Sequence, residues 1–156
     1  ANSIDNIWKM IGTKRTNGVT LERDYKEVPS VVCRARDIHQ VLMHLFNNAL
    51  DAVNEHGIIR VKIWEQDSRI FLAIADNGHG VPKHIEAKIF DPFFTTKPTG
   101  QGIGLGLNIS QNIMKEHDGH IRLKQEDGWT SFIIDMPVYG VENFCEIAFT
   151  NEIVNA

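Results

Sequence analysis

The chain contains no long apolar run. No stretch approaches the roughly 18 consecutive apolar residues that a membrane-spanning helix needs. The first residues, Ala1-Asn2-Ser3-Ile4-Asp5, have neither a basic start nor an apolar signal core. We therefore expect a cytoplasmic location for this part of the protein, and we leave membrane anchoring of a longer parent protein open.

Cysteine and excess positive charge are also scarce. The two cysteines, Cys33 and Cys145, are far apart and form no CxxC pattern, which predicts a reduced setting rather than a disulfide scaffold. The histidines have no cysteine at zinc-ligand spacing, which argues against a zinc site. With 16 Lys and Arg against 20 Asp and Glu, the net charge is −4. This balance argues against a nucleic-acid partner.

The length and composition are those of one globular domain. The 156 residues are 42% hydrophobic, and with 12 glycines about half of the chain is apolar, as is usual for globular proteins. We expect residues 1–18 to be the end of a preceding helix or a linker, and residues 19–137 to be the domain. Residues 138–156 are expected to be an extension or linker, with an extra strand or a vector-derived tail as alternatives for 144–149.

Hydrophobic periodicity predicts an α+β fold. Apolar residues at i, i+3, i+4 and i+7 predict a helix that begins with Asp37 as its cap and ends near His56. Shorter helices are predicted over 83–89 and 105–117, and a mobile loop over 92–102. Strands are predicted over 19–25, 58–66, 69–75, 119–125 and 129–137, beside a short apolar run at 31–33. The result is a mixed, mostly antiparallel sheet with about three helices on one face.

The long predicted helix carries a polar strip. On a helical wheel, Gln40, His44, Asn48 and Asp51 lie along one edge of the apolar face. An Asn amide oxygen is a hard, neutral ligand suited to a Mg²⁺ ion that phosphates also hold. The alternative is an ordinary solvated flank of the helix.

Two glycine-containing segments could approach a ligand. Asp76-x-Gly78-x-Gly80 follows a predicted strand, and its carboxylate could accept a hydrogen bond from an exocyclic amine; the alternative is a simple turn. Gly100 to Gly106 leads into a helix, whose N-terminus attracts anions such as phosphate; the alternative is a hinge. This run matches neither the Walker A nor the Rossmann pattern. Lys97, between the two segments, could place a positive charge on a phosphate or simply add solubility.

The order of these motifs resembles that of a known family. Residues 40–53 (QVLMHLFNNALDAV), 76–80, 90–94, 102–106 and the weaker Gly128-Trp129-Thr130 resemble the N, G1, F, G2 and last boxes of the nucleotide-binding domain of sensor histidine kinases. That domain belongs to the Bergerat-type (GHKL) ATPase superfamily, shared with gyrase, mismatch-repair ATPases and heat-shock chaperone ATPases. The resemblance covers roughly residues 20–137 and implies a Bergerat fold, a two-layer sandwich.

The resemblance implies roles for matching residues. Asn48 matches the Mg²⁺ ligand, and Asp76 matches the carboxylate that pairs with the adenine amino group. The start of the lid, 93–97, is similar to that of nitrogen-regulator-type kinases. The residues expected to bind ATP are Asn48, Asp51, Asp76, Gly78, Gly80, Val81, Ile89, Phe90, Thr95, Thr96, Lys97, Gly102, Ile103, Gly104, Leu105, Gly106 and Thr130.

His44 departs from the family pattern. Histidine kinases usually have Asn four residues before the Mg²⁺ ligand, and the hydrolysing members have Glu there. His44 could act as a general base on water, or it could be a hydrogen-bonding substitute near the phosphates, as in chemotaxis-type kinases. The expected catalytic residues are His44, Asn48 and Lys97.

The implied activity is protein-histidine kinase activity. None of the seven histidines matches a phosphoacceptor, so the γ-phosphate of ATP is expected to pass to a histidine on a separate dimerisation domain of the same protein. An aspartate in a response-regulator receiver domain would receive it next. The fragment itself is expected to be monomeric. The alternatives are an ATP-hydrolysing GHKL ATPase, a nucleotide-binding module without transfer activity, and a serine kinase of the same superfamily.

Overall fold

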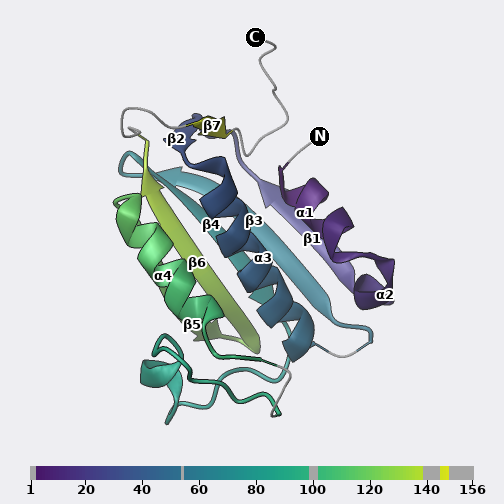
Figure 1. The fold of residues 1–156 in the computed structure, drawn as a ribbon. Helices are drawn as coiled ribbons and strands as arrows, with labels where there is room; N and C mark the ends of the chain where they lie inside the picture. The colour runs from purple at the N-terminus through teal and green to yellow at the C-terminus, as the bar shows by residue number, and fades with distance from the viewer. Residues whose placement is uncertain (1–2, 54, 99–101, 139–144, 148–156) are drawn as a thin grey trace.

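The helices and the sheet form two layers. The structure is a computed structural model that describes residues 3–53, 55–98, 102–138 and 145–147. Helices α1 (Ser3–Ile11), α3 (Ala35–Ala52) and α4 (Gly106–Glu116) lie side by side on one face of a five-stranded sheet (Figure 1). This arrangement confirms the predicted α+β sandwich. In the described part of the chain, no helix combines the length and apolar character that crossing a membrane requires.

The sheet is mixed, with one parallel pair. Its strands, in spatial order, are β1 (Thr20–Tyr25), β3 (Ile58–Gln66), β4 (Arg69–Asp76), β6 (Trp129–Pro137) and β5 (His120–Glu126). β1 pairs with β3 in parallel, and the other neighbours are antiparallel. Asp67 and Ser68 join β3 to β4 with φ of 52° and 57°, which matches the twist of a two-residue hairpin turn and confirms the predicted hairpin.

The core lies between α3 and the inner face of the sheet. The apolar stripe of α3, including Leu42 and Leu45, is fully buried against alternate residues of β3, including Val61 and Ile63. Because each element buries one face, its apolar residues recur every 3.6 residues in α3 and every second residue in β3, and these periods made both elements predictable from the sequence.

Both ends of α3 differ from the prediction. The helix follows an N-cap at Arg34, so Asp37 lies in the first turn and forms an ion pair with Arg34 Nε at 2.8 Å instead of capping. At the other end, Val53 turns to an extended conformation, and the carbonyl of Ala52 accepts a hydrogen bond from the backbone N–H of His79 at 3.2 Å. The turn after β4 thus ends the helix before His56, which only tertiary structure decides.

Helix α1 packs inside the same core. Ile4 and Ile7 are buried, and the ring of Trp8 lies 5.7 Å from that of Phe46 on α3. The apolar residues of α1 therefore have their packing partner within the described residues, while the predicted boundary at residue 18 stays a prediction. A short helix, α2 (Thr13–Thr16), connects α1 towards β1.

The smaller elements lie at the two ends of the sheet. β2 (Val31–Cys33) pairs antiparallel with β7 (Cys145–Ile147), with Cys33 opposite Cys145. The extra strand considered for 144–149 is confirmed for 145–147, and the rest of that segment lies outside the described residues. The predicted helix over 83–89 is only the 3-10 turn η1 (Glu86–Lys88), because its hydrogen bonds, such as Lys88 N–H to Ile85 O, span three residues.

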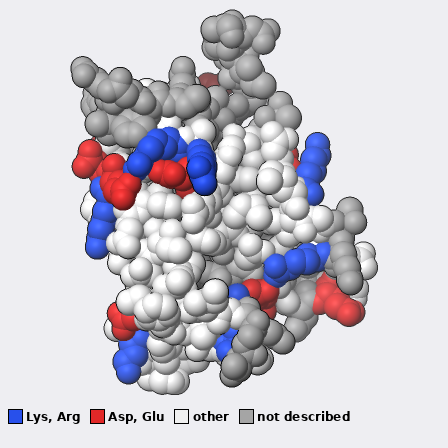
Figure 2. Space-filling view, viewed as in Figure 1, with Lys and Arg blue, Asp and Glu red and all other residues white. Residues whose placement is uncertain are grey.

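Charge is unevenly distributed over the two faces. On the helix face, Lys, Arg, Asp and Glu gather towards the edges, and the middle is largely uncharged (Figure 2). On the opposite face, the buried carboxylate of Asp135 binds Arg69, Arg122 and His120. Burial opposes ionisation of Asp135, but hydrogen bonds from His120 and Arg69 and the charges of both hold its pKa below the ordinary value.

Candidate functional site

A cavity of about 1020 Å³ opens beside the C-terminal half of α3. Its walls come from α3, the turn after β4, the segment 94–98, residues 102–105 and the start of α4. All the predicted site residues except Gly78 and Phe90 line this cavity. They are His44, Asn48, Asp51, Asp76, Gly80, Val81, Ile89, Thr95, Thr96, Lys97, Gly102, Ile103, Gly104, Leu105, Gly106 and Thr130.

Gly78 and Phe90 support the cavity from behind. A Cβ on Gly78 would collide with the carbonyl oxygen of Ala52, so only glycine lets the turn approach the end of α3. Phe90 is half-buried, and its carbonyl accepts a hydrogen bond from Asn108 Nδ2 at 3.1 Å, which ties the segment to α4. Gln40, on the predicted polar strip, is exposed and outside the lining.

Asp76 is a buried carboxylate at one end of the cavity. Its side chain ends β4, and Oδ1 accepts a hydrogen bond from the backbone N–H of Gly78 at 2.9 Å. Burial raises the pKa of this carboxyl, while the Gly78 N–H and the nearby His79 lower it. Within the described residues, Oδ2 has no hydrogen-bond partner, so it is available to a ligand.

Gln125, which no sequence motif indicated, holds the turn beside Asp76. Its Oε1 accepts hydrogen bonds from the Val81 N–H at 2.7 Å and from Thr130 Oγ1 at 3.2 Å, and its Nε2 donates to the Val81 carbonyl at 2.7 Å. One side chain on β5 therefore fixes the glycine turn against β6. Because β5 and the turn are distant in sequence, no local motif could have identified this residue.

His44 contacts the start of α4. Its Nδ1 lies 3.2 Å from Ser110 Oγ, and that hydroxyl donates to the Gly106 carbonyl at 2.8 Å. Since the hydroxyl proton is used, Nδ1 carries the hydrogen of the neutral ring, and Nε2 keeps its lone pair. Burial lowers the pKa of His44, against a raising effect of the Gly106 backbone. The ring is therefore neutral at pH 7.

Three further polar side chains of α3 line the cavity: Asn47, Asn48 and Asp51. Asn48 lies one turn beyond His44, and Asp51 follows one turn later. Asp51 forms ion pairs with Lys97 and with Arg15. Asn47 also lines the cavity, although the prediction did not include it.

The glycine segment brings backbone N–H groups to the cavity. Gly104 has φ of 71°, and a Cβ there would lie 2.5 Å from the Phe93 carbonyl carbon, so glycine is required. Helix α4 then starts at Gly106 with no side-chain hydrogen bond at its N-cap, Leu105. Its first N–H groups and the positive end of its dipole are available to an anion.

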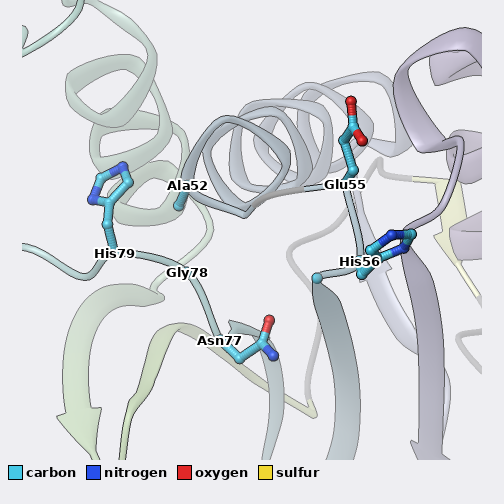
Figure 3. A pocket seen from close by; sticks show the side chains of 7 residues that line it. Ala52, Glu55, His56, Asn77, Gly78 and His79 are labelled. Carbon is cyan, nitrogen blue, oxygen red and sulfur yellow. The ribbon is translucent and has the colours of Figure 1, made fainter.

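A second hollow of about 730 Å³ lies behind Gly78. It is lined by Ala52, Glu55, His56, Gly57, Asn77, Gly78 and His79. In Figure 3, His79 and His56 lie on opposite sides of the end of α3 and do not converge. Asn77 Oδ1 already accepts from the Ile58 N–H at 2.7 Å, and the described residues contain no group of three or more metal-binding side chains. The side chains suited to binding a ligand therefore lie in the larger cavity.

The sequence profile of the histidine kinase-, DNA gyrase B- and HSP90-like ATPases matches residues 33–140, which include the whole cavity. The chain belongs to this family. Signal transduction histidine-protein kinase AtoS from Escherichia coli K12 is 41% identical over 103 residues. These residues are 65% of this chain but only 17% of that kinase, so the chain spans a small part of its curated relative.

Solved structures give the same result. The nucleotide-free catalytic domain of histidine kinase ThkA is 28% identical, with a TM-score of 0.79 over 88% of this chain and 91% of that domain. ThkA in complex with the response regulator TrrA aligns at 27% identity and a TM-score of 0.74, over 87% of this chain and 39% of ThkA. The family member described here is thus an ATP-binding catalytic domain of the sensor histidine kinase type.

Proposed function

We propose that the cavity binds Mg²⁺-ATP and presents its γ-phosphate to a histidine on a dimerisation domain of the same protein, for relay to an aspartate of a response-regulator receiver domain. The observation that carries the proposal is the pair of opposed groups in one cavity: the buried Asp76 carboxylate and the uncapped start of α4. One group suits a base amine and the other suits phosphate. Since ATP is supplied in the cytoplasm, we place the domain there.

The Asp76 carboxylate would favour adenine over guanine as the base of the bound nucleotide. Its available oxygen can accept a hydrogen bond from the 6-amino group of adenine, whereas guanine has a carbonyl acceptor at that position and would leave a buried carboxylate unpaired. Apolar lining residues, including Ile85, Ile89 and Phe132, offer surfaces to a flat ring.

The other end of the cavity suits the phosphates. We expect Gly102 to Gly106 and the first turn of α4 to bind phosphate oxygens through N–H groups, with Lys97 adding a positive charge. The Asn48 amide oxygen is a hard ligand in this lining and fits Mg²⁺, which would neutralise phosphate charge when bound. The chain then supplies positioning and electrostatic stabilisation.

A specific observation also favours a second candidate function, ATP hydrolysis. His44 is neutral, and its Nδ1 is fixed by Ser110, so that Nε2 could accept a proton from water. In phosphate transfer, by contrast, the same neutral ring would only hydrogen-bond near the phosphates.

Calorimetric titration separates these functions. Mg²⁺-ATP should give a saturable binding heat and Mg²⁺-GTP should give none. Continuing heat after each ATP injection would indicate hydrolysis, and absence of any ATP heat would contradict nucleotide binding. The transfer step is tested by adding radiolabelled ATP and the separately prepared dimerisation domain, with a variant lacking the acceptor histidine as control. Binding without labelling would contradict the kinase assignment.

A further inference from the structure

One carboxylate joins two segments of the chain that are far apart in sequence. Asp51, in the last turn of α3, accepts a hydrogen bond on Oδ1 from Arg15 Nη2 at 2.5 Å. Its other oxygen, Oδ2, accepts from Lys97 Nζ. Arg15 belongs to α2, whereas Lys97 belongs to the segment 94–98, which lines the cavity. Asp51 is therefore shared between two positive charges.

Only part of this ion-pair cluster faces the cavity. Asp51 and Lys97 line it, and Arg15 stands outside the lining. Arg15 is also anchored through Nη1, which donates to Asn47 Oδ1 at 2.8 Å, one turn before Asp51. Two contacts to neighbouring turns of α3 therefore fix the guanidinium beside Asp51.

The arrangement has an electrostatic consequence for a polyanionic ligand. Phosphates entering the cavity attract the Lys97 ammonium and repel the Asp51 carboxylate. If Lys97 turned towards the phosphates without any other cation present, Asp51 would be left as an uncompensated negative charge at their side. Arg15 removes this penalty, because it keeps its ion pair with Asp51 while Lys97 changes partner.

We propose that Arg15 is a positioning residue for nucleotide binding, which neutralises Asp51 and so releases Lys97 to the phosphates. The inference rests on the proposed function, since it needs ATP in the cavity. It links α2, which lies before the matched family region, to the phosphate end of the site.

The first test is Arg15→Gln, with ATP affinity measured by calorimetry. Removal of the cation should weaken ATP binding about fivefold, the upper range for a partly exposed ion pair. Arg23→Gln is the matched control, because Arg23 also forms an ion pair, with Asp5 at 2.7 Å, but Asp5 does not line the cavity, whereas Asp51 does. Its ATP affinity should equal that of the wild type.

The second test is rescue by Asp51→Asn in the Arg15→Gln background. A neutral residue 51 no longer repels phosphate or holds Lys97, so the double variant should bind ATP more tightly than Arg15→Gln alone. A merely structural role of Arg15 predicts no rescue, and that result would overturn the inference. If the wild type binds ATP and Arg15→Gln binds it with the same affinity, the inference about Arg15 is overturned, while the proposed function stands. Absence of ATP binding by the wild type would instead refute the proposed function.

Discussion

Asp76 and Thr130 are direct cross-strand partners in the β4–β6 ladder, and both side chains are buried in the wall of the same cavity. The hydroxyl of Thr130 donates to Gln125, so it leaves the Asp76 carboxylate without a partner from β6. A buried carboxylate oxygen of Asp76 therefore stays available to a ligand although this destabilises the fold, which is characteristic of a ligand site.

Asp76→Asn should separate binding from stability. We expect ATP affinity to fall at least about tenfold, because the amide no longer offers a charged acceptor to the base. The raised pKa means that the native state binds this proton more tightly than the unfolded state, so ionised Asp76 destabilises the domain as pH rises through its native pKa. The free energy of unfolding of the nucleotide-free variant at pH 7, measured in urea, should therefore equal or exceed that of the wild type.

The same carboxyl predicts a pH dependence of binding. ATP affinity should fall as the pH is lowered through the raised pKa of Asp76, because the protonated group loses its acceptor role. Calorimetry as a function of pH measures this effect. Unchanged ATP affinity in Asp76→Asn, or a variant that is much less stable than the wild type, would contradict the assigned role.

Asn48→Ala tests the proposed metal ligand. The wild type should bind ATP more tightly with Mg²⁺ than with a chelator, and the variant should lose most of this difference because a hard oxygen ligand is gone. Gln40→Ala is the matched control, since Gln40 lies on the same polar strip of α3 but outside the cavity. Equal dependence on Mg²⁺ in Asn48→Ala and the wild type would show that the ion is held elsewhere.

His44→Asn separates a general base from a hydrogen-bonding role. If His44 only hydrogen-bonds near the phosphates, an amide should replace it, with ATP affinity within about threefold and transfer to the dimerisation domain retained. Release of inorganic phosphate, followed over hours, reports hydrolysis. A wild-type rate that disappears in the variant would make His44 the base of a hydrolytic reaction.

Gly104→Ala should damage the phosphate end of the cavity. The alanine would have to adopt φ of 71°, and its Cβ would lie 2.5 Å from the Phe93 carbonyl carbon. We expect ATP affinity to fall about tenfold or more, because the backbone must shift where it meets the ligand. Gly12→Ala imposes a similar strain, at φ of 86°, but the new Cβ meets nothing within 4 Å. Its ATP affinity should be unchanged, and equal effects of both variants would contradict a role for the close contact.

Asp135→Asn should destabilise the domain without affecting nucleotide binding. Loss of the buried charge leaves Arg69 and Arg122 uncompensated, with an expected decrease of about 1–3 kcal/mol in the free energy of unfolding. Because the native pKa of Asp135 is lowered, its stabilising effect is present above the unfolded-state pKa and is lost as pH falls through the native value. Urea unfolding at several pH values measures both effects.

The exposed pair Lys62–Asp24 supplies the matched control for Asp135. Its ion pair is 3.5 Å long, so Lys62→Gln should change stability by less than about 0.5 kcal/mol. If Lys62→Gln and Asp135→Asn lost similar stability, or if the pH dependence of stability persisted in Asp135→Asn, the buried cluster around Asp135 would not be the source of that stability.

The chain's local patterns determined most of its secondary structure and the composition of its site. The apolar stripe from Ile38 to Leu45 and the alternation from Ile59 to Ile63 each have one buried face, so their periods are readable without a structure. The glycines at 80 and 104 need positive φ, and this requirement is also visible in sequence. Motif order then indicated an ATP-binding domain, which the family match confirmed.

Only the tertiary structure decided how distant segments meet. The end of α3 depends on the N–H of His79, the glycine turn depends on Gln125, and Asp51 pairs with Arg15 as well as with Lys97. These contacts join residues with no local relationship, so no periodicity records them. The sequence alone determined most of the residues that line the proposed ATP site, because local geometry and chemistry depend on neighbouring residues. Folding determined their protonation, partners and support, because burial and charge pairing exist only once the layers have packed.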